Sequence, residues 1–211
     1  MRPERPVHHL VIEIGRQWRR HEVRREAFRV FRSVVIEALV GADFRDSQRL
    51  IAQDGAGPTR GRLEPLLTED LWLAKAAPRE LTPPHIALSA QRSQAGHTVT
   101  LTATPRSGGR YFRILLRSSR DLTNLTIDGR AVPTGLPRNT WSQVTYHAPG
   151  NSAVTLVLQA PAGPGQLEVK VIEVRDGWPS GAEPAPRPEN VLAFRKSDST
   201  WIAAGSVVEW R

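Results

Sequence analysis

The apolar residues of this 211-residue chain change their spacing near residue 80, and from His85 onward they alternate with polar or small ones. Residues 86–90 and 99–103 show this period of two most clearly. A period of two places the apolar side chains on one face of a strand, whereas a helix needs a period near 3.6. The second part of the chain is therefore predicted to form half-buried β-strands.

About seven candidate strands follow one another at the short spacing typical of antiparallel sheets. They cover residues 86–90, 97–104, 111–117, 122–127, 141–147, 153–159 and 167–174. Turn-forming residues separate them, and Asp128-Gly129 is the sharpest hairpin signal. The pattern predicts a mainly β fold with an antiparallel, immunoglobulin-like β-sandwich over residues 85–175.

Residues 8–40 show helical spacing of their apolar residues instead, and we predict one long helix there, ended by Gly41. Residues 54–65 are rich in glycine and proline and are interpreted as a linker. Residues 1–78 thus form a predicted basic, α-helical segment. A proline-rich boundary at 79–84 separates it from the sandwich.

The middle of the predicted helix is dense in arginine. A stripe of arginines on one helix face contacts either anionic lipid headgroups or nucleic-acid phosphates. The alternative is a solvated helix in which the arginines pair with Glu22 and Glu26. The candidate contact residues for an anionic surface are Arg16, Arg19, Arg20, Arg24, Arg25, Arg29 and Arg32.

The last part of the chain, residues 176–211, is predicted to be a proline-rich tail. Within it, residues 191–194, 201–202 and 207–210 are candidates for edge strands or for segments that pack on the sandwich.

Motifs for catalysis or metal binding are missing from the sequence. The chain has no cysteine, which excludes thiol catalysis and thiolate zinc sites. Its six histidines show no zinc-motif spacing, and no phosphate loop or nucleophile elbow occurs. We therefore predict no catalytic, cofactor or metal site and a non-enzymatic protein. A hydrolase whose site is assembled from distant loops is the third alternative.

Apolar runs such as 34–36 and 38–40 are far shorter than the roughly 18–20 residues that span a bilayer. No transmembrane segment is expected. The first residues lack the apolar stretch of a signal peptide, which predicts a cytoplasmic location if the chain is whole.

Several segments occur in an order that resembles a known family. They are residues 98–103, 109–117, 125–133, 141–149, 154–158, 174–179 and 197–200. From about residue 84 to 211 the chain is similar to the C-terminal extracytoplasmic β-sandwich of multi-pass bacterial zinc exopeptidases, metallopeptidase family twenty-eight.

The resemblance implies an accessory domain in the periplasm, beside a membrane-embedded peptidase or another envelope protein. The family's zinc ligands and membrane spans have no counterpart in residues 1–83, so no catalytic residue is carried over. Two hypotheses account for residues 1–78: a truncated or re-started reading frame, or a fusion of a basic helical segment to a sandwich. The expected function is an accessory or binding role, and nucleic-acid or anionic-lipid binding through the Arg16 to Arg32 stretch is the alternative.

Overall fold

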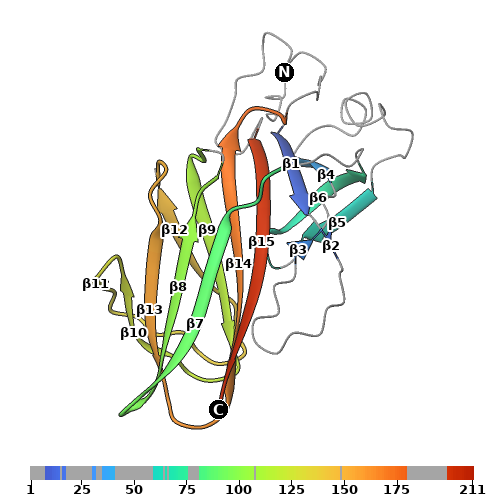
Figure 1. The fold of residues 1–211 in the computed structure, drawn as a ribbon. Coiled ribbons are helices and arrows are strands. Elements are labelled where there is room, and N and C mark those ends of the chain that lie inside the picture. The colour runs from blue at the N-terminus through green and yellow to red at the C-terminus, as the bar shows by residue number, and fades with distance from the viewer. Residues whose placement is uncertain are drawn as a thin grey trace.

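A computed structural model of the chain describes residues 81–106, 108–147, 149–179 and 199–211 in full, together with Gly61, Arg62 and Pro65. For six further strands in the first 75 residues it describes the backbone. The described residues form a mainly β structure without a helix, so the predicted β class is confirmed (Figure 1). In this part of the chain no helix has the length and apolar character needed to cross a bilayer.

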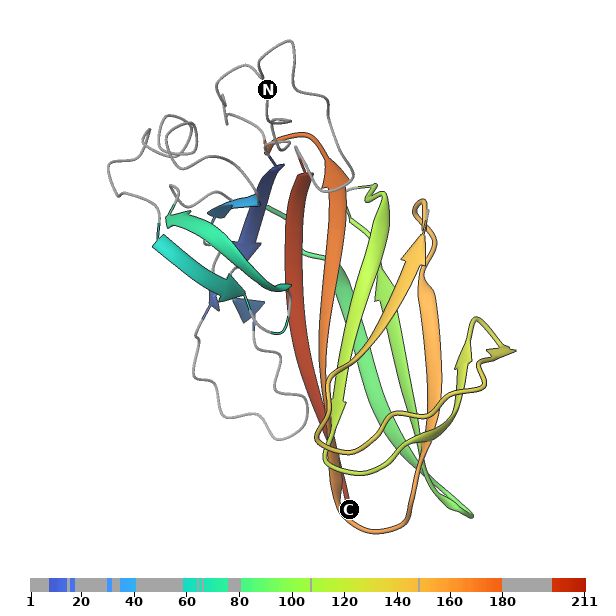
Figure 2. The ribbon, with the colours of Figure 1, turned by 180° about the vertical axis from the view of Figure 1, so that it is seen from behind.

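Nine strands build two sheets that pack face to face (Figures 1 and 2). They are β7 (His85–Ser93), β8 (Gly96–Thr104), β9 (Tyr111–Ser118), β10 (Thr123–Ile127), β11 (Arg130–Ala131), β12 (Ser142–His147), β13 (Val154–Ala160), β14 (Gly165–Asp176) and β15 (Ser199–Trp210). One sheet has the order β11-β10-β13-β8-β7, and the other contains β12-β9-β14-β15. All seven candidate strands are found at their predicted places.

The core lies between the inward faces of these sheets. On β9 the inward residues Phe112, Ile114 and Leu116 are fully buried, and Val99 and Leu101 face them from β8. Each alternates with a residue on the other face of its strand, as the period of two predicted. Burial of apolar surface at about 25 cal/mol per Å² is the main force that holds the two sheets together.

The tail contributes more than the predicted edge strands. β15 runs over twelve residues in one strand and lies between β14 and β1 (His8–Ile14), inside the larger sheet. It pairs with β14 over its whole length, from Ser199 opposite Asp176 to Trp210 opposite Gly165. Residues 191–194 lie outside the described residues.

Strands also occur where the long helix and the linker were predicted. The larger sheet continues from β15 through β1, β4 (Val35–Val40) and β6 (Leu67–Lys75) to β5 (Thr59–Leu63), and a small separate pair consists of β2 (Arg16–Gln17) and β3 (Val30–Phe31). β1 pairs in parallel with β15, and the other pairings of this sheet are antiparallel.

The physical reason lies in side-chain shape and in pairing. β-branched residues are frequent at both ends of the predicted helix, and such residues favour strands. β1 pairs in parallel with β15, and this pairing satisfies backbone N–H and C=O groups along one edge of β15. A helix at residues 8–14 would not pair with them. Residues 15, 18–29 and 32–34 lie outside the described residues, so the long-helix prediction for residues 8–40 stays a prediction.

The predicted hairpin at Asp128-Gly129 is confirmed. Asp128 and Gly129 have φ of 48° and 77°, and they join β10 to β11. Positive φ at both turn residues is the type I′ geometry that matches the twist of the strands.

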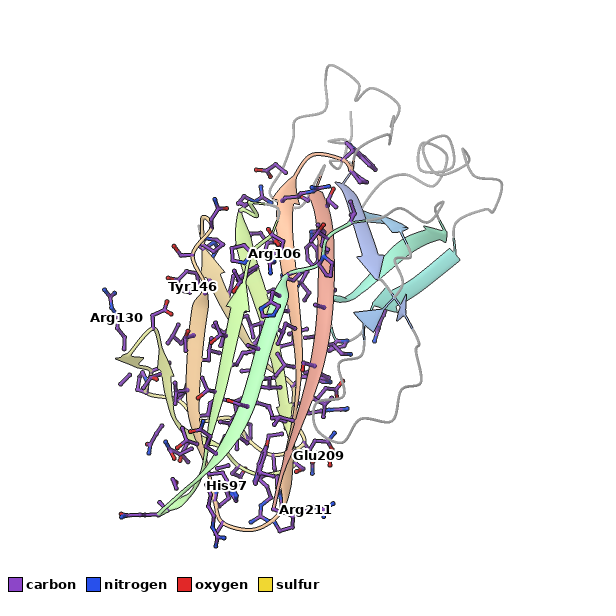
Figure 3. All side chains as sticks on the ribbon, in the orientation of Figure 1. His97, Arg106, Arg130, Tyr146, Glu209 and Arg211 are labelled. Atoms are coloured by element: carbon purple, nitrogen blue, oxygen red, sulfur yellow. The ribbon has the colours of Figure 1, made fainter. Side chains whose placement is uncertain are left out.

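The Asp128 carboxylate accepts a hydrogen bond from the Thr155 backbone N–H at 2.8 Å and another from the Tyr146 hydroxyl. Because Tyr146 belongs to the other sheet, its bond links the two sheets at their open side, where Figure 3 shows Tyr146 and Arg130.

The contact between Asp128 and Tyr146 should stabilise the fold up to alkaline pH and be lost above it. The hydrogen bond and the charge of Asp128 raise the pKa of Tyr146 above its ordinary value of 10.0, and Arg130 opposes them. Stability from the link is complete below pH 10.0 and is lost as the pH rises through the higher folded-state pKa. In a Tyr111→Phe background, where Tyr146 is the one remaining tyrosine, Asp128→Asn should move the tyrosinate absorbance midpoint down. Arg130→Gln should move it up, and equal midpoints in all three proteins would contradict the assignment.

Candidate functional site

The outward face of β12, β9, β14 and β15 carries all the cation–aromatic pairs of the described residues. The pairs are Arg110 with Tyr111, Arg113 with Trp201, Arg117 with Trp141, and Lys170 with Trp141. They lie outside because alternate residues of β9 and β14 face the core. We call this surface the cation–aromatic face.

One accessible part of this face is the Trp141 group, which consists of Arg117, Trp141, Glu168 and Lys170. Arg117 and Glu168 lie opposite each other on β9 and β14, and Arg117 Nη2 is 2.6 Å from Glu168 Oε2. Arg117 and Lys170 stand 4.8 and 4.9 Å from the centre of the Trp141 ring. With 47% of the Arg117 side chain and 32% of the Lys170 side chain exposed, both cations are within reach of a partner in solution.

Further along the face, Arg113 lies 4.8 Å from the ring centre of Trp201. Trp201 is fully buried, and its indole Nε1 makes no hydrogen bond. A cation held against a ring out of water interacts more strongly than at an exposed site, by up to about 2 kcal/mol. This pair therefore stabilises the fold and is not open to a ligand.

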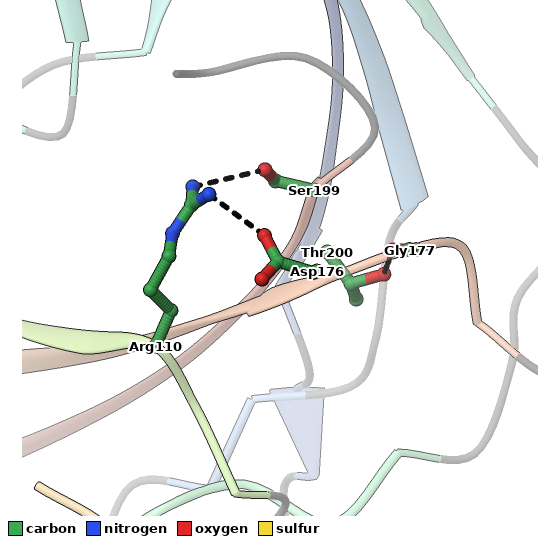
Figure 4. A network of polar contacts seen from close by, with 5 residues as sticks. All are labelled: Arg110, Asp176, Gly177, Ser199 and Thr200. Carbon is green, nitrogen blue, oxygen red and sulfur yellow. Dashed lines mark hydrogen bonds and ion pairs between the residues drawn. The ribbon is translucent and has the colours of Figure 1, made fainter. Parts of the chain in front are cut away.

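The far end of the face holds the Arg110 group, drawn in Figure 4. Arg110 Nη1 is 2.7 Å from Asp176 Oδ1, and Nη2 donates to Ser199 Oγ at 3.4 Å. Next to it, Thr200 Oγ1 donates to the Gly177 carbonyl at 2.6 Å. These contacts join the start of β9 to the end of β14 and the start of β15.

This end of the sheet brings a serine, an aspartate and a histidine into one region, and these are the residue types of a serine-hydrolase triad. Ser199 is 1% exposed and bonds to Arg110, which also holds Asp176. His147 stacks on Tyr111, with 5.7 Å between ring centres. A serine nucleophile needs a base within hydrogen-bond reach and a path for its substrate. The Arg110 guanidinium cannot be that base, and Ser199 is buried. The wider hydrolase alternative, with a site assembled from distant loops, stays a prediction.

A buried carboxylate positions the Arg110 group. Glu173 is fully buried on the inward face of β14, near the C-terminal end of the strand. Its carboxylate accepts hydrogen bonds from the backbone N–H groups of Arg106 (3.0 Å) and Gly109 (2.9 Å). Gly109 is required there, because a Cβ would stand 2.5 Å from Glu173 Cγ. These bonds fix the loop from which Arg110 starts. Figure 3 labels Arg106 on this loop, away from the end that holds His97.

Sequence reasoning missed Glu173. The available signal was a single acidic residue inside the otherwise apolar run 171–174 of a predicted strand, together with Gly108-Gly109 in a loop. A charge at a core position must be hydrogen-bonded, and a glycine pair lets backbone approach it closely.

The predicted arginine site lies largely outside the described residues. Arg16 is described by its backbone in β2, and Arg19, Arg20, Arg24, Arg25, Arg29 and Arg32 are not described.

The three histidines whose side chains the structure describes lie on separate strands. His85 begins β7, His147 ends β12, and His97 lies near the start of β8, where its Nε2 is 3.1 Å from the Arg211 carbonyl. Among the described residues no group of three or more His, Asp or Glu is placed to hold a metal ion.

Comparison of the chain with known protein families, with curated proteins and with solved structures finds no match. The cation–aromatic face is therefore the feature from which we infer a function.

Proposed function

We propose that the chain is a non-catalytic binding domain that recognises an acidic segment of a partner protein through the Trp141 group. One observation carries this proposal: two cations, each at least about one-third exposed, converge on one partly exposed tryptophan ring on the outward face of the sheet.

The charges on the face favour an acidic ligand. The face carries four cations, Arg110, Arg113, Arg117 and Lys170, against three carboxylates, which are Glu168, Asp176 and, at the end of β15, Glu209. The Arg117 guanidinium has five N–H donors, and its Nη2 donates to Glu168. The other donors are therefore available for a further carboxylate. The Trp141 ring beside them removes water from one side, which strengthens each charged contact.

The resemblance noted in the sequence extends this proposal. It supports an immunoglobulin-like class for the sandwich, an accessory role, and a partner that is a membrane-embedded peptidase or another envelope protein. In keeping with that class, the chain crosses between the two sheets five times from β8 to β14, because β8, β10, β11 and β13 lie in one sheet and β9, β12 and β14 in the other.

A charge-matched pair of variants tests the proposed site. Arg117→Gln/Lys170→Gln removes both cations of the Trp141 group, and Arg92→Gln/Arg130→Gln removes two exposed arginines elsewhere. The probe is fluorescently labelled polyglutamate, followed by anisotropy. We expect the first variant to lose about tenfold in affinity, equivalent to about 1.4 kcal/mol, and the second to lose little. Equal losses would mean that net charge, and not this site, binds the probe.

The alternative is nucleic-acid or anionic-lipid binding through the Arg16 to Arg32 stretch. The observation in its favour is seven arginines against two glutamates within residues 16–32. Duplex DNA should then bind at low salt and dissociate steeply as salt is added, whereas absence of binding at low salt removes the nucleic-acid form of this alternative.

A further inference from the structure

Natural proteins protect the edges of their sheets, because an exposed edge presents unpaired backbone groups to other chains. Three of the four edge strands in the two described sheets have such protection. β11 has two residues, carries Arg130 and is followed by Pro133; β7 follows Pro83-Pro84 and carries Arg92; β5 follows Pro58 and carries Arg60 and Arg62.

The fourth edge, β12, is also followed by a proline, Pro149, but the strand itself carries no charged residue. Its sequence Ser-Gln-Val-Thr-Tyr-His contains no lysine, arginine, acid, proline or glycine. All six residues pair with β9 without a bulge, and β12 is the last strand of its sheet. Gln143, Thr145 and His147 are exposed on its outward face. β12 is thus a regular, uncharged edge with no partner strand on its outer side among the described residues.

We propose that β12 pairs antiparallel with β12 of a second copy of this chain, so that one sheet runs through the dimer. Around a two-fold axis, a residue near the centre of such a pair meets its own copy. Any charge there would repel itself, so an uncharged strand is what self-pairing requires. With Thr145 at the axis, Gln143 lies opposite His147 on the outward face and Val144 lies opposite Tyr146 on the inward face.

Charges on the next strand do not oppose this arrangement. Arg113 lies opposite Thr145 on β9, so the two copies of Arg113 are three strand spacings apart, or about 14 Å. That distance exceeds the Debye length of about 8 Å at physiological ionic strength. The dimer would place two Trp141 groups on one molecule, but the pairing does not depend on their function.

The test measures the oligomeric state of the full chain by analytical ultracentrifugation over a range of concentrations. Gln143→Lys/Thr145→Lys places two exposed cations on β12. Like charges then meet across the dimer whether residue 144 or residue 145 lies at the two-fold axis. The matched control, Ser89→Lys/Gln91→Lys, places the same charges at the same spacing on exposed positions of the edge strand β7. We expect the wild-type and control chains to dimerise and the β12 variant to be monomeric.

A second variant, Gln143→Glu/Thr145→Glu, shows whether the loss is specific. It should be monomeric alone, and a mixture of the lysine and glutamate variants of β12 should form a dimer, because opposite charges then meet. Circular dichroism confirms that each variant is folded. A monomeric wild-type chain, a β12 variant that still dimerises, a control that dissociates, or a mixture that stays monomeric would each overturn the proposal.

Discussion

Replacing Glu173 by leucine should lower the free energy of unfolding by about 3–5 kcal/mol. Hydrogen bonds to a charged group are worth about 1.5–3 kcal/mol each, and the substitution removes two of them. It also leaves the N–H groups of Arg106 and Gly109 without their acceptor, in a place that is part-buried for Arg106 and buried for Gly109. The measurement is urea denaturation followed by tryptophan fluorescence.

Two controls separate this effect from a general cost of substitution. Glu173→Gln keeps one acceptor oxygen and should lose about half as much. Glu168→Leu changes an outward-facing glutamate on the same strand, whose ion pair with Arg117 is partly exposed, and should cost no more than about 1 kcal/mol. A Glu173→Leu chain as stable as Glu168→Leu would contradict the buried anchor.

Gly96→Ala should also destabilise the fold by about 3–5 kcal/mol. Gly96 has a φ of 136°, a conformation that residues with a Cβ rarely adopt. A Cβ would stand 2.2 Å from the Ala160 carbonyl oxygen and 2.8 Å from two further backbone atoms, which belong to Pro161 and Ala162. Backbone atoms cannot turn aside as a side chain does, so β8 would have to move away from the end of β13.

The control for this prediction is Gly150→Ala. Gly150 has a φ of 57° but no atom within 4 Å of the added Cβ, so the substitution tests backbone strain alone. It should cost about 1–2 kcal/mol. Thermal and urea unfolding of both variants compare the two costs, and equal values would contradict the close approach of β8 to residues 160–162.

The strands of the sandwich could be predicted from the sequence because their signal is local. Alternation shows which residues of one strand share a face, and Asp128-Gly129 has the backbone freedom that a tight hairpin needs. β15 was harder to predict, because Ala203, Ala204 and Gly205 at its centre are not strong strand formers. Pairing with β14 along its full length holds them in the strand, and the local sequence of the segment does not indicate that pairing.

The candidate site could be predicted only in part, for the same reason. Alternation places Arg113 and Arg117 on the outward face of a strand that starts near Tyr111. It does not show that Trp141, from a later segment, lies over Arg117, because that contact depends on the register of β12 on β9. The Arg110 group depends likewise on residues far along the chain, at Asp176 and Ser199.

The most direct test of the central claim is the indole N–H resonance of Trp141 during a titration with polyglutamate. Each of the six tryptophans gives one such signal, and loss of one signal in Trp141→Phe identifies it. The Trp141 signal should shift in proportion to binding. Trp210, which is buried on the inward face beside His97, should keep its position. A Trp141 signal that stays unchanged while polyglutamate saturates the chain would contradict the claim that this face is the binding site.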